Sequence, residues 1–329
     1  MKILGDNQMN FMRYEMEDLV CSGHRLRKVK KMINFSIIAN TFSDLETTVG
    51  RKGYGVEVGI KCLFLQFFYD LSDREFEERL RDDISFRWFC GFSLKEQTPD
   101  HTFMSRFRKV LGTKRVGDIF SLIVKASERA NIIRPVFTFV DASSIKRKET
   151  TWQERDKALA NEEDHLNNKN VDKYSSDKDA RFGCKGKNKF WFGYKRHCSS
   201  DMSSGLIKKV AVTKANIPDH KGLKYVCPKE GMVFADKGYA TKEAHRVLKS
   251  KKCHSGIILK NNMKLKNKDK DKWISKLRMP FERIFSKSRK RTRYMGLAKT
   301  QMQAFMEATV HNIKSLMTLD APPLCLGGI

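Results

Sequence analysis

The stretch that decides the fold is VFADKGYATKEAHRVL, from Val233 to Leu248, in which a short apolar run ends at Asp236. Gly238 follows at once and marks a turn, and the apolar spacing after it predicts a helix over 241–250. An acid at a strand end, where side chains converge on a cleft, is well placed to bind a metal ion or a proton. The alternative interpretation is that Asp236 only starts a turn.

The sequence around this stretch alternates between short β-rich runs and helical patterns. A helix over 278–288 is predicted from its apolar side, and a linking helix is predicted near 117–131. One run ends near Asp141, and the predicted strands lie within 135–144, 188–197, 205–216, 232–238 and 254–259. Three strands followed by strand, helix, strand and helix predict a mixed α/β domain.

The region before residue 130 has helical spacing. Ser72 with Glu75 three residues later forms a capping box, which predicts a helix over 73–82. The dense apolar run from Gly55 to Phe68 predicts a buried helix, and apolar residues at helical spacing near 103–111 predict short helices joined by tight turns. Such a helix-turn-helix-like arrangement would present basic residues to DNA, namely Arg106, Arg108 and Lys109.

The chain is strongly basic. Its 65 Lys and Arg against 38 Asp and Glu give a formal charge of +27, which indicates a polyanionic partner. The most apolar run, Cys62–Phe68, is too short to span a bilayer, so no membrane partner is expected. The eight cysteines contain no CxxC pair, and we expect a reduced, cytoplasmic protein without structural zinc.

Two polar segments interrupt the predicted mixed α/β domain. The connection over 145–187 is mostly charged or polar, and a connection of this length is usually functional or disordered. The lysine-rich segment 264–272 is expected to be a charged loop that steers DNA. We expect three regions: a helical region over 1–130, a mixed α/β domain over 131–320 and a tail over 321–329.

Three acids stand on three different predicted elements: Asp141, Asp236 and Glu282. Carboxylates that gather in one site repel one another, so such a site needs cations. Two Mg²⁺ ions roughly 4 Å apart would suit an in-line displacement at phosphorus. The alternatives are that Asp141 caps a turn and that Glu282 pairs with an arginine of its own helix.

The motifs FVDASS, FADKGY and RMPFERIF resemble the three acidic motifs of DDE transposases from bacterial insertion sequences, in the family-four and family-five group. The resemblance extends through flanking blocks over roughly residues 50 to 317. It implies an RNase-H-like α/β catalytic domain, a mixed sheet with flanking helices, behind an all-α DNA-binding region. It also implies that Asp141, Asp236 and Glu282 bind two Mg²⁺ ions, for which Mn²⁺ can substitute.

The third motif carries basic groups expected to hold phosphate near the cut. Arg278 fills the family's arginine position, Arg289 replaces the expected lysine, and Ser275 stands where the family often has a tyrosine. Asp236 and Glu282 are 46 positions apart (282 − 236), which leaves no room for the large β-rich insertion of some relatives. The basic run expected to contact phosphates is Arg283, Lys287, Arg289, Lys290, Arg291 and Arg293.

His197 lies on the second predicted strand and could approach the acids as an accessory group. The alternative is a structural histidine with satisfied hydrogen bonds.

The sequence thus predicts a nucleoid-associated transposase that binds the terminal inverted repeats of its element, with a homodimer on paired ends implied by the family. Water would attack the phosphodiester at the element end, and the freed 3′-hydroxyl would attack target DNA. The alternatives are a structure-selective nuclease with the same fold and an inactive DNA-binding relic of a transposase.

Overall fold

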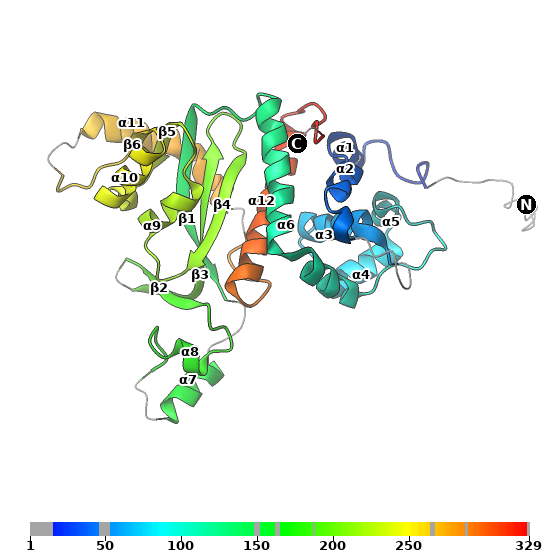
Figure 1. Cartoon of the computed structure of the whole chain (residues 1–329), viewed down its shortest axis with the longest axis horizontal. Coiled ribbons are helices and arrows are strands. Elements are labelled where there is room, and N and C mark those ends of the chain that lie inside the picture. The colour runs from blue at the N-terminus through cyan, green and yellow to red at the C-terminus, as the bar shows by residue number, and fades with distance from the viewer. Residues whose placement is uncertain are drawn as a thin grey trace, which may run out of the picture. The chain divides into compact units, whose positions relative to one another are not determined.

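The computed structural model describes residues 16–45, 53–147, 152–161, 165–186, 188–263, 267–286 and 289–327, with the backbone alone over 278–286. The chain divides into two compact units, shown with their elements in Figure 1. The first contains the residues up to Gly112 together with those from Ala321, and the second is Thr113–Asp320. Across the described ranges, no helix is long and apolar enough to cross a bilayer.

The first unit is helical. The long helix α6 (His101–Arg129) begins here, and its backbone breaks at Gly112, where φ is 71° and ψ is 163°. Before it come α1 (Arg25–Met32), α2 (Phe35–Asn40), the 3-10 turn η2 (Ser43–Leu45), α3 (Gly55–Phe68), α4 (Asp73–Asp82) and α5 (Ile84–Cys90).

Side-chain and glycine caps define the ends of these helices, and one of them was predicted from the sequence. The Ser72 hydroxyl accepts a hydrogen bond from the Glu75 amide, and the Glu75 carboxylate accepts one from the Ser72 amide, which confirms the capping box of α4. Asp83 ends α4 and caps α5 in one residue, and Gly91 ends α5 at a φ of 90°. The predicted tight turns are therefore confirmed, although the helix that follows is longer than expected.

The phenylalanines of this unit form its core. Phe35, Phe64 and Phe89 are buried, and their ring centroids are 5.4 to 5.9 Å apart. Phe107 packs so closely on α3 that a Cβ at Gly59 would lie 2.3 Å from its ring. The buried helix predicted over Gly55–Phe68 is confirmed.

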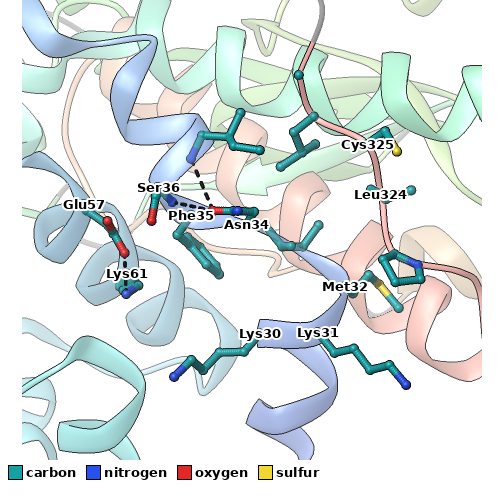
Figure 2. Close-up of a pocket in the computed structure, with 15 residues that line it drawn as sticks. Lys30, Lys31, Met32, Asn34, Phe35, Ser36, Glu57, Lys61, Leu324 and Cys325 are labelled. Carbon is teal, nitrogen blue, oxygen red and sulfur yellow. Dashed lines mark hydrogen bonds and ion pairs between the residues drawn. The ribbon is translucent and has the colours of Figure 1, made fainter.

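A cavity of about 700 Å³ opens beside α1, α2 and α3, and Figure 2 shows its lining. Residues 323–327 form one wall, and the Leu324 amide donates to the carbonyl of Met32 at 3.0 Å. Leu324 and Leu326 are buried. The segment expected to be a tail is therefore packed into the helical unit.

The second unit is built on a six-stranded mixed sheet. The strand order is β2-β3-β1-β5-β6, and β4 also pairs with β3. β3 is antiparallel to β1, β2 and β4, whereas β1, β5 and β6 are parallel. The strands are β1 (Phe137–Lys146), β2 (Arg181–Lys185), β3 (Lys189–Asp201), β4 (Ile207–Lys214), β5 (Gly231–Ala235) and β6 (Cys253–Ile257).

Helices cover both faces of this sheet. α9 (Asp219–Val226) and α10 (Lys242–Ser250) pack on the face that contains Val140, in a shared apolar core. α12 (Leu297–Thr318) lies along β4 on the opposite face, where α11 (Lys268–Ser286) approaches β1. The predicted fold class is confirmed as a mixed α/β sheet with flanking helices that follows a helical region in the chain.

Two expected boundaries are wrong. β1 continues past Asp141 to Lys146, because β3 pairs with it along this whole length. α11 begins at Lys268, ten residues before the predicted start, so 268–272 is helix and not loop. The Asn267 side chain caps this start by accepting from the Lys270 amide at 2.9 Å.

The long connection after β1 is anchored by buried polar contacts. It contains α7 (Trp152–Leu159), α8 (Val171–Tyr174) and β2. Arg147 and Glu154 form an ion pair at 2.8 Å, with side chains only 2% and 11% exposed. The Tyr194 hydroxyl donates to Asp177 at 2.7 Å, and the Asp179 carboxylate accepts from the first amide of α12 at 3.0 Å. The described parts of the connection are therefore anchored to the second unit.

Candidate active site

Asp141 and Asp236 lie at equivalent positions on two chain segments that run side by side. β1 pairs with β5 in a register that sets Phe139 beside Phe234. Each aspartate follows two residues later, and the backbone at Asp236 is still extended, so both carboxylates leave on the face of the two phenylalanines. Because paired strands lie about 4.8 Å apart, the two half-buried acids are adjacent.

Asp236 also starts the short 3-10 helix η3 (Lys237–Tyr239). Its Oδ1 accepts a hydrogen bond from the Gly238 amide at 2.8 Å, so the turn-starting role weighed from the sequence is real. A Cβ at Gly238 would lie 2.9 Å from this oxygen, which explains the glycine. Oδ2 accepts no hydrogen bond from any residue that the structure describes, so one oxygen remains to bind a cation.

Tyr239 lies beneath these acids. Its side chain is buried, and its hydroxyl has no hydrogen-bond partner within the described ranges. Burial raises the pKa of Tyr239 well above its usual value, and the charges of Asp141, Asp219 and Asp236 raise it further. The hydroxyl therefore lies within the field of three carboxylates. Sequence reasoning missed Tyr239, although it ends the FADKGY motif.

A buried cation stands on the same face as Asp141. Arg196 pairs with Glu307 of α12 at 2.6 Å, and the two side chains are 3% and 14% exposed. Its guanidinium also donates to the carbonyl of Arg289 at 3.2 Å. Arg196 thus joins β3, α12 and the basic run, a role that became visible only once the strands were paired.

His197 points the other way. It stands opposite Ala142 in the β1–β3 register, whereas Asp141 stands opposite Cys198, so strand alternation places His197 on the other face. Its Nε2 lies 2.9 Å from the Thr213 hydroxyl. Burial lowers the pKa of His197 to about 4, which keeps the ring neutral. Its place on the opposite face favours the structural interpretation of His197 over the accessory one, although Nδ1 has no hydrogen-bond partner among the described residues.

The helix that carries Glu282 covers the face of the two aspartates. α11 approaches β1, and the Trp273 ring lies 6.3 Å from that of Phe234. The side chains of Arg278, Glu282 and Arg283, like the whole of Lys287, lie outside the described residues, so their roles stay predictions. A cavity of about 420 Å³ opens between Asp236 and the first half of α11, with a lining that includes Lys237, Leu259, Asn261, Lys268 and Ser275.

The second half of the basic run is a segment held by its main chain, here named the basic strap (residues 289–293). The Lys146 amide donates to the carbonyl of Lys290 at 2.7 Å, and the Lys146 carbonyl accepts from the Thr292 amide at 2.8 Å. Gln303 of α12 bonds the strap at two further main-chain atoms. Because its backbone is anchored, the strap can present side chains outward, and the exposed ones include Arg289, Lys290 and Arg291, while Arg293 is half-buried.

The three basic residues predicted in the helical unit differ in their contacts. Arg108 forms a bidentate ion pair with Asp73 at 2.9 and 2.6 Å, and its side chain is only 11% exposed. Arg106 and Lys109 are exposed on α6. Arg108 therefore stabilises the fold of this unit, and Arg106 and Lys109 remain the better candidates for DNA contact.

Within the described side chains, no three His, Cys, Asp or Glu residues are grouped closely enough to hold a metal ion. Asp141 and Asp236 supply two carboxylates. A third ligand would have to come from a side chain outside the described set, such as Glu282.

Comparisons with known proteins give this site its context. Residues 14–110 match the family model described as Transposase domain (DUF772), and residues 133–313, more than half of the chain, match Transposase DDE domain. A cryo-EM structure of the piggyBac transposase synaptic complex with hairpin DNA is similar over 91% of this chain and 75% of that chain, with 8% identity and a TM-score of 0.38. The assignment rests on the two family models. The chain belongs to the DDE transposases, DNA-cleaving and DNA-transferring enzymes that use divalent metal ions.

Proposed function

We propose that this protein is the transposase of a bacterial insertion sequence, which binds the terminal inverted repeats of its element and cuts and transfers the DNA strand there. The main support is the β1–β5 register, in which Asp141 and Asp236 fall at equivalent positions. Both lie within the part of the chain that matches the DDE domain.

The donor set fits a hard divalent cation. Carboxylate oxygens are the ligands that Mg²⁺ and Mn²⁺ prefer, and Asp236 keeps one oxygen outside its bond to Gly238. Asp141, Asp236 and Glu282 would hold two Mg²⁺ ions, Glu282 reaching from the helix that approaches β1. When bound, two such ions supply the charge that activates an attacking oxygen and stabilises a leaving one.

Residues further along β1 and beside it would hold the DNA on either side of the cut. Arg289, Lys290 and Arg291 are exposed on the basic strap, whose backbone is fixed to β1 and α12, so they can position phosphates without first being ordered. Arg278, Arg283, Lys287 and Arg293 would extend this contact. Attack by a water oxygen on phosphorus breaks the bond to the 3′-oxygen and frees a 3′-hydroxyl, which then attacks a phosphodiester of target DNA.

Two further expectations accompany the proposal. Two copies of the chain would act together on paired element ends, and Arg106 and Lys109 of the helical unit would help to hold those ends. The substrate, chromosomal DNA, would be met in the bacterial cytoplasm at the nucleoid.

Strand cleavage of a labelled duplex that carries the repeat flanking the gene tests the proposal, with Mg²⁺ or with EDTA. Asp236→Asn keeps the acceptor oxygen for Gly238 and removes the charge. We expect cleavage to need the metal and to fall in this variant by more than the roughly 10–100-fold that loss of an outer-shell partner costs. Asp156→Asn, an exposed aspartate that pairs with its neighbour Arg155 on α7, is the matched control and should cleave normally.

Three other results would each contradict a different part of the proposal. Normal cleavage by Asp236→Asn would exclude this acid from the mechanism. Cleavage without transfer to a plasmid target would indicate a structure-selective nuclease. DNA binding without cleavage by the unaltered protein would indicate an inactive relic.

A further inference from the structure

Asp141 lies midway along β1 and Asp236 lies just past the end of β5, and a cluster of lysines lies at the opposite end of these strands. β1, β4, β5 and β6 all run in one direction, so their first residues lie at a common edge. α9 and α10 end close to this edge, just before β5 and β6 begin. We name the cluster gathered there the lysine edge, which consists of Lys208, Lys209, Lys229, Lys249, Lys251 and Lys252.

Lys209 shows how closely these charges are packed. It is half-buried, and its ammonium donates to the carbonyl of Cys227 at 2.5 Å. Burial lowers the pKa of Lys209, and the positive charges of Lys251, Lys229 and Lys208 lower it further. The ammonium groups are therefore near enough to repel one another.

Among the described residues, the negative charge at this end of the sheet is smaller than the charge of the six lysines. The C-termini of α9 and α10 contribute about half an elementary charge each, Glu230 adds one carboxylate beside Lys229, and Asp201 adds another at the end of β3, opposite Thr138. Four of the six lysines are exposed to solvent, namely Lys229, Lys249, Lys251 and Lys252. An external polyanion would relieve the repulsion, as phosphates do on basic surfaces that bind DNA.

A phosphate held near Asp141 and Asp236 is too far away to supply this charge. β5 starts at Gly231, and Asp236 follows five residues later, roughly 16 Å along the strand. The Debye length at physiological ionic strength is about 8 Å. The lysine edge therefore needs an anion of its own.

We propose that the lysine edge binds a second DNA duplex through its phosphate backbone, separately from the duplex being cut at Asp141 and Asp236. The choice of a second duplex rests on the proposed function, because a cut element end must meet target DNA. The six residues of the lysine edge are all lysines, which fits sequence-independent contact with phosphates.

Charge reversal with a matched control tests the surface. Lys229→Glu, Lys251→Glu and Lys252→Glu are combined in one variant of the full chain. The control combines Lys157→Glu, Lys169→Glu and Lys173→Glu, which change the net charge equally on the exposed surface of the α7–α8 segment. Thermal unfolding shows whether both variants are folded. If charge reversal harms folding, Lys→Gln at the same three edge positions removes the charge and keeps most of the aliphatic side chain.

The first measurement is the affinity for a short random-sequence duplex at several salt concentrations. Each lost phosphate contact lowers the slope of log K against log salt by about 0.9. We expect the edge variant to lose about two to three units of slope and the control to match the unaltered protein. Equal slopes for edge variant and control would overturn the proposal.

The second measurement asks whether the duplex is a second one. The end-repeat duplex is immobilised and saturated with protein, and labelled random duplex is then added. We expect the unaltered protein to retain the label and the edge variant to retain about tenfold less. A slope change without any difference in retention would mean that the edge contacts the duplex being cut, which overturns the proposal. Since neither measurement needs cleavage, failure of the cleavage test alone would leave this surface standing.

Discussion

Asp141 and Ala142 are neighbours in β1, yet the two faces of the sheet on which they lie could hardly differ more. On the Asp141 face, half-buried acids share the sheet with a buried ion pair, and an exposed basic strap is bonded to the end of β1. On the Ala142 face, the His197 ring is buried against α9 and stays neutral. One step along a strand thus separates a chemical site from a packing site, because side chains alternate.

Breaking the buried pair on the Asp141 face should have the largest effect. Arg196→Met leaves Glu307 buried without its cation, so we expect the free energy of unfolding to fall by about 3–5 kcal/mol in urea denaturation. The double variant Arg196→Met with Glu307→Leu removes both charges and should recover most of the loss. A loss below about 1 kcal/mol in the single variant would show that the pair does not hold this face together.

Acidic pH should lower the free energy of unfolding through His197, on the Ala142 face of the sheet. The pKa of His197 is about 4 in the folded protein and about 6.5 when unfolded, so only the unfolded state takes up the proton between these values. Stability should therefore fall as the pH drops from about 6.5 to 4, by about 3 kcal/mol from this group. Urea denaturation of the unaltered protein and of His197→Gln over this range measures the difference. Parallel curves would argue against a buried neutral ring.

A smaller effect is expected where α9 meets His197. A Cβ at Gly222 would lie 2.2 Å from Nδ1 of the ring, so Gly222→Ala should cost about 1–3 kcal/mol of unfolding free energy despite the better helix propensity of alanine. In a His197→Ala background the same substitution should be neutral or stabilising. Equal costs in both backgrounds, measured as a double-mutant cycle, would contradict the proposed contact.

Local signals in the sequence predicted much of the fold. The capping box of α4, the five runs that became β1, β3, β4, β5 and β6, and the buried α3 all follow from spacing and turn residues. β2 and α9 were not predicted. β2 is short and polar, and α9 contains Gly222, a poor helix former that is required there by the close approach of His197.

The site was predictable only in part. Each aspartate could be assigned to a strand end or strand, but the register that makes them neighbours is set by pairing between Phe139 and Phe234, which no local pattern encodes. The same holds for Arg196 and Glu307, which are far apart in the sequence. The resemblance of three short motifs supplied the missing long-range information, and the position of the Glu282 carboxylate stays a prediction.

The helical unit has one feature that matters before the protein ever meets DNA. Its cavity wall at 323–327 is made long after α1, with the entire sheet unit between them in the chain. On the ribosome, the groove beside Met32 must therefore stay open until Leu324 and Leu326 emerge to fill it. The order of synthesis makes the helical unit the first to begin folding and the last to be completed.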